Sequence, residues 1–520
     1  MKEKAKKIIL IILIILFCIS ISPITMQNDT YYSIAIGEHI LKNGIDMKDP
    51  FSWHENLPYT YPHWGYDVAT YLVYSIGQTL YGQTGAYFAI YLATAILAAI
   101  LGITLFKINE KLAKNTLISF AITLVTMYSL RGYIAARAQL VTFILFILEI
   151  YFIEMFLKEP KKRYIFGLII IPILIANLHV AVWWFYFILY LPYVVEYILV
   201  KISKSEDKTI LTRVEITANK NVKYLIIIMI ICLFTGLLTP LGTTPYTYLI
   251  KTMVGNTTQN INEHLPMTLM QHTEVIISLA IILAIFIFTK TKIKLSDLFM
   301  LLGLIFLMFY SRRQLSLFFL IGSIIVNKML TNLLKDYKEN GMDILENILF
   351  SKIGMALISL LVVILSVNFI VKKDGEKFVS ESTYPVQASE WILENLDVSK
   401  IKLFNEYNYG SYLLYKGIPV FIDSRADLYA PEFNTPTGKK EDGKDIFMDF
   451  INASYINSFY EDIFEKYGIT HVILYRNSKM NLIICNTNDG KYDCIYEDKY
   501  FTIYEIKEKV LDTTQLQESE

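Results

Sequence analysis

The chain is poor in charge and in cysteine. Only 18% of its 520 residues are charged, against about 25% in an average soluble protein, which excludes an ordinary cytosolic enzyme. The 48 lysine and arginine residues are balanced by 48 aspartate and glutamate residues, so there is no overall positive surface for nucleic acid. The four cysteines are too few for a disulfide scaffold, and none lies in a CxxC pair that would indicate a zinc site.

Long apolar runs are what the sequence has in abundance. From residue 8 to about 371 they alternate with short lysine-bearing stretches, and about 20 apolar residues are enough for a helix to cross a bilayer. This pattern predicts an α-helical polytopic membrane protein. We expect about eleven transmembrane helices, at 8–24, 85–106, 115–130, 138–157, 164–177, 181–199, 224–239, 275–289, 297–310, 315–330 and 353–371.

The distribution of basic residues predicts the topology, because lysine and arginine near helix ends resist translocation. If the N-terminus is cytoplasmic, the lysine-rich loops all lie on the inner side, and the outer loops contain only Lys42, Lys48 and Lys251. We therefore expect a multi-pass plasma-membrane protein whose residues 372–520 are extracytoplasmic. The first run could instead be a signal peptide, but no small-residue cleavage site follows it, which favours an uncleaved anchor.

The first predicted outer loop, 25–84, contains two further apolar segments. Residues 68–80 are too few to span the roughly 30 Å of hydrocarbon comfortably, so we expect this segment to lie in the interface or to dip into the outer leaflet. Residues 32–40 have apolar side chains at the i, i+3, i+4, i+7 spacing of one helix face. The loop is thus predicted to carry two juxtamembrane helices.

The C-terminal region has mixed polarity and ordinary turn signals, which predicts a small α/β domain at 372–520 beside a transmembrane domain at 1–371. Two cysteines, Cys485 and Cys494, could pair in an oxidising compartment or remain as two buried thiols. We expect helices at 385–396, 410–415 and 445–467, and strands at 401–406, 419–423, 470–475, 481–486 and 493–506, with the last two antiparallel around Asn488-Asp489-Gly490.

Asp29 is the first candidate catalytic residue. It follows the first predicted helix by about five residues, at the lip of the membrane, where a partly desolvated carboxylate could act as a general base on an alcohol acceptor. The alternative is a helix N-cap, because an aspartate before a helical segment accepts hydrogen bonds from free backbone N–H groups.

The same loop is rich in aromatic, histidine and aspartate residues. Trp53, His54, His63 and Asp67 could bind a sugar, because aromatic faces stack on pyranose rings and carboxylates accept hydroxyl hydrogens. The aromatic residues could equally form an interfacial belt. Asp29 with His63 or Asp67 could hold a divalent metal ion, although the spacing is irregular.

Arginines gather at the predicted outer ends of the helices. Arg137, Arg312 and Arg313 are expensive to desolvate at the membrane without an anion, and arginine offers a bidentate fork to phosphate oxygens. The alternatives are snorkelling to lipid headgroups and pairing with a loop carboxylate. His179, at a tight predicted hairpin, and Glu263 add an imidazole and a carboxylate to the same side.

These features resemble the GT-C superfamily of glycosyltransferases that use polyprenyl-phosphate sugars, which contains the protein mannosyltransferases and the lipid A aminoarabinose transferases. The local strings look like those of a prokaryotic branch, and the resemblance covers most of the chain. The strings are DTYY from Asp29, GEHIL from Gly37, DPFSW from Asp49, NLH from Asn177, RQ at Arg313, NEYNYGSYL from Asn405 and FIDSRADLY from Phe421.

The resemblance implies that Asp29 is the catalytic base, because the first-loop acid has this role in the superfamily. Several members have two adjacent acids at this place, whereas here Thr30 follows Asp29, which leaves the acceptor and any metal dependence open. The DSRAD string at Asp423 has no established task in the superfamily, and a structural turn with an Asp–Arg pair is the simpler interpretation.

The sequence therefore favours an integral-membrane, inverting glycosyltransferase. It would transfer a sugar from a polyprenyl-phosphate donor to an acceptor on the outer face, which could be a lipid, a surface polymer or a protein. No cofactor is certain, and a divalent metal ion is left open. One rival is a lipid-linked glycan transporter, which would need polar residues along its transmembrane path, where Glu149 and Glu154 are the nearest candidates. The other is a non-catalytic scaffold that presents the C-terminal domain.

Overall fold

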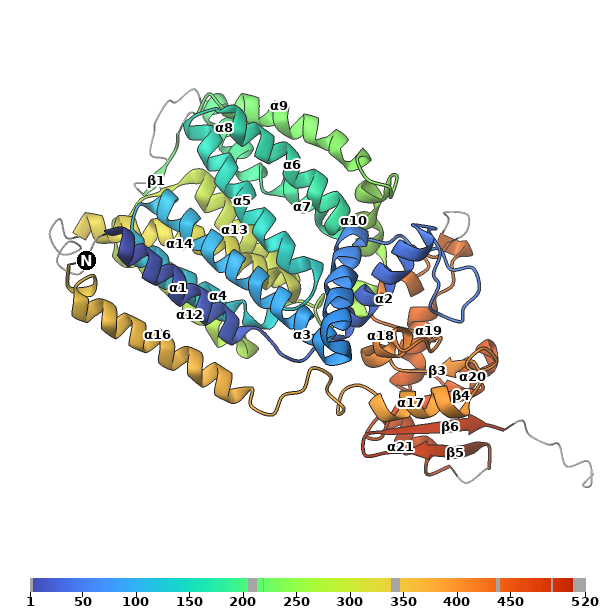
Figure 1. Ribbon diagram of the computed structural model, residues 1–520. Coiled ribbons are helices and arrows are strands. Elements are labelled where there is room, and N and C mark those ends of the chain that lie inside the picture. Colours follow the sequence, from blue (N-terminus) through green and yellow to red (C-terminus); the bar gives the residue numbers. More distant parts are fainter. Residues whose placement is uncertain are drawn as a thin grey trace, which may run out of the picture. The chain divides into compact units, whose positions relative to one another are not determined.

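The protein is described by a computed structural model that covers residues 3–203, 213–217, 219–337, 347–435, 440–487 and 490–507 (Figure 1). The chain forms two compact units. The helical unit consists of Met1–Ile24, Tyr61–Ile250 and Thr258–Phe378, and the mixed unit consists of Thr25–Thr60, Lys251–Thr257 and Val379–Glu520. The mixed unit thus combines the C-terminal region with most of the first predicted outer loop.

A helix covers most of each of the eleven apolar ranges predicted above. The helical unit contains α1 (Glu3–Ile21), α3 (Trp64–Ala113), α4 (Thr116–Ser129), α5 (Ala138–Lys158), α6 (Lys162–Leu178), α7 (Trp183–Ile188), α8 (Leu191–Ser203), α9 (Val222–Leu233), α12 (Thr273–Phe288), α13 (Leu295–Tyr310), α14 (Leu315–Tyr337) and α16 (Lys352–Lys372). Helices α10 (Thr244–Val254) and α11 (Thr257–Asn260) each contain one of the boundaries between the units.

Among the described residues, five helical stretches are long and apolar enough to cross a membrane by length and composition: Trp64–Ala113, Ala138–Lys158, Val180–Ile202, Arg312–Lys335 and Lys352–Lys372. Shorter apolar helices lie at Thr116–Ser129, Val222–Leu237, Thr273–Phe288 and Leu295–Tyr310. The chain is therefore a helical membrane protein, and the count of eleven crossings stays a prediction.

Aromatic side chains form much of the core of the helical unit. Phe143, Phe146 and Phe156 on α5 are almost completely buried, as is Trp183 at the start of α7. Helix α16, in contrast, exposes leucine and isoleucine side chains along most of its length. An apolar helix surface of this kind is suited to contact with lipid.

Helix α3 is two helices joined at a kink. Tyr81 and Gly82 have non-helical backbone angles, and Gly82 has a φ of +63°, which glycine adopts without strain. The two pieces approach so closely that a Cβ atom on Gly77 would lie 2.4 Å from the carbonyl oxygen of Gly85. The segment 68–80 is therefore a helix that folds back at the kink, and its place at the membrane interface stays a prediction.

The mixed unit contains a four-stranded sheet in the order β3-β4-β6-β5. Strands β3 and β4 are parallel, and the other pairs are antiparallel, with Val472 on β4 opposite Tyr504 on β6. The strands are β3 (Leu403–Phe404), β4 (His471–Tyr475), β5 (Tyr492–Glu497) and β6 (Phe501–Ile506). The helices are α2 (Asn28–Asn43), α17 (Val386–Asn395), α18 (Tyr407–Tyr415), α19 (Ile446–Ser454), α20 (Tyr460–Tyr467) and α21 (Lys479–Ile484).

Several local predictions for this region are wrong. The predicted strand 481–486 is largely helix α21, because the Ser478 hydroxyl accepts a hydrogen bond from the Asn481 backbone N–H and starts a helix there. The hairpin turns at Asp498 instead, whose carboxylate accepts from the backbone N–H groups of Tyr500 and Phe501 at 2.7 and 2.8 Å. The predicted strand 419–423 forms only a single bridge, between Val420 and Ser52.

Two further details differ from expectation. The predicted helix 445–467 is interrupted after Ser454, where Ile456 takes a φ of +59° that ends regular helix. Cys485 and Cys494 are free thiols, and both are exposed. The structure thus contains neither the disulfide nor the pair of buried thiols considered from the sequence.

Candidate functional site

Asp29 lies in the first turn of α2, as its second residue. The N-cap position belongs to Gln27, which makes no capping hydrogen bond through its side chain, so the interpretation of Asp29 as the N-cap is wrong. A carboxylate in the first turn is nevertheless favourable beside the free N–H groups of the helix. The side chain is partly exposed, as a group that meets an acceptor must be.

Helix α2 is fixed firmly inside the mixed unit. The side-chain amide of Asn28 donates to the backbone carbonyl of Tyr407 at 3.0 Å. Tyr31 is fully buried, and its ring lies 5.0 Å from the rings of Tyr384 and Tyr412. Edge-on aromatic contacts of this kind add to the burial energy. The backbone that carries Asp29 is therefore held on both sides of that residue.

Trp53 and His54 belong to the mixed unit and both bind its backbone. The Trp53 indole N–H donates to the carbonyl of Leu403 at 3.0 Å, and His54 Nε2 donates to the carbonyl of Phe421 at 2.8 Å. Burial lowers the pKa of His54 to about 4, so this imidazole is neutral at pH 7. The sugar-binding role of the two residues stays a prediction, and the structure gives both a task in holding the loop.

The DSRAD string forms a buried ionic network. Arg425 donates to both carboxylate oxygens of Asp423, at 2.9 and 2.7 Å, and to Asp49 at 2.7 Å. Burial alone would raise the pKa of Asp49, but the Arg425 charge and hydrogen bonds from Ser52 outweigh it, and the pKa is lowered. The interpretation as a structural Asp–Arg turn is confirmed, and Asp49 from the distant DPFSW string completes it.

A different cluster of polar side chains lies in the helical unit, around the N-terminus of α5. Arg137 is the residue before α5, and its Nη1 lies 3.3 Å from Glu263 Oε1. The backbone N–H of Arg313 donates to the Glu263 carbonyl at 2.8 Å, and the Ser311 hydroxyl bonds to the same carbonyl. Two segments far apart in sequence thus bring two arginines to one carboxylate, and the alternative pairing of an arginine with a loop carboxylate is confirmed for Arg137.

Two histidines adjoin this cluster. The rings of His63 and His179 lie 5.0 Å apart, and His179 Nδ1 is hydrogen-bonded to the hydroxyl of Thr142 on α5 at 2.8 Å. The approach of the two segments depends on Gly65, where a Cβ atom would meet the carbonyl oxygen of Asn177 at 3.0 Å. His63 and His179, 116 residues apart in the sequence numbering, are therefore neighbours.

The electrostatics of the cluster favour an anion. Burial lowers the pKa of His63 to about 3, and the positive charges of Arg313 and Arg137 act in the same direction. Burial and Arg313 likewise lower the pKa of His264 to about 4. Both imidazoles are neutral at pH 7, and the charges that act on them come from Arg137, Arg313 and Glu263. Burial would raise the pKa of Glu263, but Arg137 and Arg313 outweigh it and lower that pKa.

Arg312 and Asp67 also lie in the helical unit. The Arg312 Nε donates to the carbonyl of Pro266 at 3.3 Å, and the Arg312 carbonyl accepts from the Tyr133 hydroxyl. Asp67 is completely buried in the first turn of α3. Within the part of the chain that the structure describes, no group of three or more His, Cys, Asp or Glu side chains could hold a metal ion.

The sequence reasoning did not identify Thr142 or Ser311. Both are ordinary hydroxyl residues beside apolar stretches, and nothing in their own neighbourhood distinguishes them from solvent-facing or helix-bonded hydroxyls. Thr142 falls one helical turn beyond Ala138, at the start of α5. A search for polar residues in the first turns of the predicted helices would have found it.

No family model matches the sequence, and no curated protein matches it. Solved structures do match the fold. The oligosaccharyltransferase AglB from Archaeoglobus fulgidus, solved in complex with an inhibitory peptide and a dolichol-phosphate, superposes with a TM-score of 0.51 at 9% identity, over 90% of this chain and 69% of AglB. The apo form of the Archaeoglobus fulgidus oligosaccharyltransferase superposes with a TM-score of 0.53 at 11% identity, over 91% and 70% of the two chains.

At such low identity the likeness concerns the fold and not the chemistry, but it extends over nine-tenths of the chain. It agrees with the resemblance that the local strings indicate. The chain therefore has the fold of these archaeal oligosaccharyltransferases.

Proposed function

We propose that the protein is an integral-membrane, inverting glycosyltransferase that takes a sugar from a polyprenyl-phosphate donor on the outer face of the membrane. The fold supports a membrane glycosyltransferase in general. The donor, the outer-face acceptor and the assignment of residues rest on the charges described above.

The observation that carries the proposal is the pair of arginines whose charges act on Glu263. Arg137 and Arg313 both act on Glu263, and Arg313 has no ion pair of its own with a carboxylate in the described part of the chain. The neighbouring imidazoles of His63 and His264 are neutral at pH 7. Two guanidinium groups facing one carboxylate suit a phosphate, which accepts bidentate hydrogen bonds from arginine.

The proposed reaction needs a base for the acceptor and a partner for the leaving group. Asp29 takes the proton from an acceptor hydroxyl as its oxygen attacks the anomeric carbon of the sugar. The bond between that carbon and the phosphate oxygen breaks, and the polyprenyl phosphate leaves with the electron pair. Arg137 and Arg313 stabilise the negative charge that develops on the phosphate, so the leaving group needs no proton. Attack on the face opposite the phosphate inverts the anomeric centre.

The orientation follows from the lysine distribution. The clusters at 107–114, 158–163 and 290–294 keep their loops on the cytoplasmic side, which assigns Arg137 and the mixed unit to the outer side. The N-terminus is then cytoplasmic and the C-terminal region extracytoplasmic, in the plasma membrane.

The role of Asp29 is tested with the full-length protein in nanodiscs that contain radiolabelled polyprenyl-phosphate sugars. We expect Asp29→Asn to lower sugar transfer or release at least 100-fold, within the range of roughly 10² to 10⁴ that general bases contribute. Glu38→Gln is the matched control, because Glu38 lies on the same helix and pairs with the exposed Lys42. Equal turnover in a folded Asp29→Asn variant would contradict the assignment.

The arginines are tested by donor binding and turnover together. Arg137→Gln and Arg313→Gln should weaken donor binding and slow transfer about 10²-fold to 10³-fold, as loss of one transition-state charge partner does. Arg131→Gln is the control, since Arg131 stacks on Tyr128, 4.0 Å from its ring centre, and is exposed. Donor binding without turnover in the wild-type protein would instead favour the transporter or the scaffold.

A further inference from the structure

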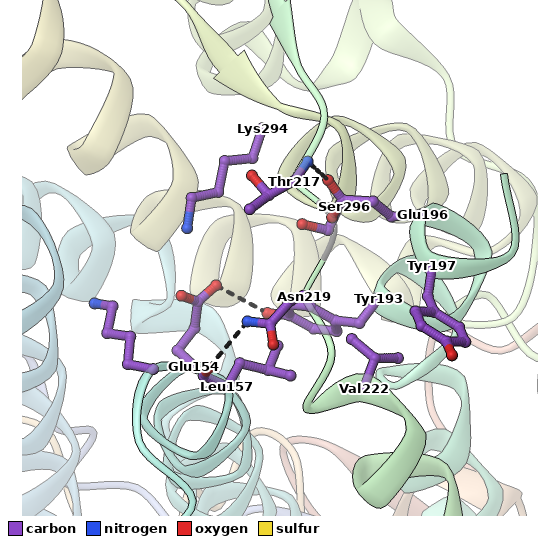
Figure 2. Close-up of a pocket in the computed structure, with 11 residues that line it drawn as sticks. Glu154, Leu157, Tyr193, Glu196, Tyr197, Thr217, Asn219, Val222, Lys294 and Ser296 are labelled. Atoms are coloured by element: carbon purple, nitrogen blue, oxygen red, sulfur yellow. Dashed lines mark hydrogen bonds between the residues drawn. The ribbon is translucent and has the colours of Figure 1, made fainter. Parts of the chain in front are cut away.

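A second polar site lies at the other end of α5. Arg137 precedes this helix and Lys158 ends it, and 21 helical residues extend about 30 Å. Around Lys158 a pocket of about 70 Å³ opens in the helical unit (Figure 2). It is lined by Glu154, Leu157, Lys158, Tyr193, Glu196, Tyr197, Thr217, Asn219, Val222, Lys294 and Ser296. A volume of this size holds several water molecules or one tetrahedral anion.

The carboxylates of the pocket already have partners. Lys328 lies between Glu154 and Asp297, at 3.1 and 2.9 Å, and is almost buried. The Tyr193 hydroxyl donates to Glu154 at 3.2 Å. Glu196 accepts a hydrogen bond from the backbone N–H of Thr217, which Figure 2 marks with a dashed line. These acidic groups are therefore neutralised or hydrogen-bonded before any ligand arrives.

Two lysines of the pocket, Lys158 and Lys294, differ from these acidic groups in their pairing. Neither Lys158 nor Lys294 forms an ion pair with a carboxylate in the described part of the chain. The positive charges of Lys294, Lys328 and Lys114 act against that of Lys158, whereas the Glu154 carboxylate attracts it. Two ammonium groups without an ion pair thus line one pocket, and an anion between them would relieve their mutual repulsion.

The remaining lining suits an oxyanion. The Thr217 side chain lines the same pocket and adds a hydroxyl group to the lysines, whereas Ser296 bonds to Glu196 and the Asn219 amide donates to the carbonyl of Leu157 at 2.9 Å. In Figure 2 the side-chain nitrogen of Lys294 points toward the Glu154 carboxylate. Lysine binds phosphate as a point charge, and basic pockets between helices at the cytoplasmic side of membrane proteins bind lipid phosphates.

We propose that this pocket binds a phosphate group through Lys158 and Lys294, either from the headgroup of a lipid in the adjacent leaflet or from a soluble phosphate compound. The site is separate from the Arg137 cluster, and the proposal does not depend on the glycosyltransferase reaction. A ligand there would join α5, α13 and the segment before α9 at one point.

The experiment uses the full-length protein in phosphate-free maltoside detergent. Inorganic phosphate is titrated in one arm, and phosphatidylglycerol in mixed micelles in the other, with binding followed by calorimetry and phosphorus NMR. We expect saturable binding that weakens at least tenfold in the Lys158→Gln/Lys294→Gln double variant. Lys292→Gln is the control, because Lys292 lies two residues from Lys294 but pairs with Glu215 at 3.5 Å. Lys294→Arg should retain binding.

Each outcome decides the proposal. Binding of inorganic phosphate that depends on the two lysines identifies a soluble ligand, and lysine-dependent binding of the lipid alone identifies a headgroup. No saturable binding in either arm overturns the proposal, as does equal binding by the wild-type protein and a folded double variant. If the double variant does not fold, the single Lys158→Gln and Lys294→Gln variants take its place.

Discussion

Charged side chains have different surroundings in the two units. In the mixed unit, Arg425 is buried and meets two carboxylates, Asp423 and Asp49, and its hydrogen bonds hold a turn and a loop together. In the helical unit, the charges of Arg137 and Arg313 both act on the half-exposed carboxylate of Glu263. Buried carboxylates that each accept hydrogen bonds from one arginine indicate a structural role, whereas Arg313 forms no ion pair with a carboxylate in the described part of the chain, which leaves its guanidinium group available to a ligand. The same residue types therefore indicate a structural role in the mixed unit and a ligand site in the helical unit.

The largest effect we predict is on the stability of the mixed unit. Arg425→Leu removes the cation between Asp423 and Asp49 and leaves two buried carboxylates without their partner, which should cost about 3–5 kcal/mol of unfolding free energy. Chemical denaturation followed by the fluorescence of Trp53 and Trp391, the tryptophans of the mixed unit, measures it.

Arg476→Leu is the control, because Arg476 pairs with Glu497 on the surface and such pairs contribute about 1 kcal/mol or less. If Arg425→Leu proved no more destabilising than Arg476→Leu, the Asp49–Arg425–Asp423 network would not have the structural role assigned to it.

The next prediction concerns the stability of the mixed unit at acidic pH. The pKa of His54 is lowered by burial from 6.5 to about 4, so the folded unit binds its proton later than the unfolded chain does. The stability from the neutral imidazole is complete above pH 6.5 and is lost as the pH falls toward 4, by about 2 kcal/mol between pH 6.5 and pH 5. Unfolding measured at both pH values should show this slope in the wild-type protein and a smaller one in His54→Gln. An unchanged slope in the variant would assign the acid sensitivity to other groups.

Much of the helical unit could be predicted from the sequence, because apolar runs of helix length have few alternatives in a membrane protein. The kink of α3 was harder to predict, since it depends on Gly77 and Gly85 meeting, a contact between two pieces of one apolar stretch. In the mixed unit the strands are short, and β3 has only two residues. An apolar segment of that length has no periodicity to identify it.

The candidate site shows the same division between local and distant information. The pair of Asp423 and Arg425 could be predicted because the two residues are close in sequence, but Asp49 lies 376 residues from Arg425. Arg137 and Glu263 were each selected as polar residues at the predicted outer side, yet their pairing depends on a loop that the Arg313 backbone holds. The strings near Asp49, Asn405 and Phe421 gave no hint that they contact one another.

The smallest predicted effect tests the charges around Arg137 most directly. Glu263→Gln removes a carboxylate paired with Arg137, so a phosphate would no longer compete with it for the guanidinium group. Because Glu263 is half exposed, solvent screens the pair, and such pairs are worth about 0.2–1 kcal/mol. Polyprenyl phosphate should therefore bind about two- to fivefold more tightly to Glu263→Gln than to the wild-type protein in nanodiscs. Glu274→Gln, which removes the carboxylate near His272, should leave binding unchanged. Weaker binding by Glu263→Gln would mean that this carboxylate positions Arg137 for the ligand and does not compete with it. The difference between this cluster and the Asp49–Arg425–Asp423 network would then lie in geometry and not in charge.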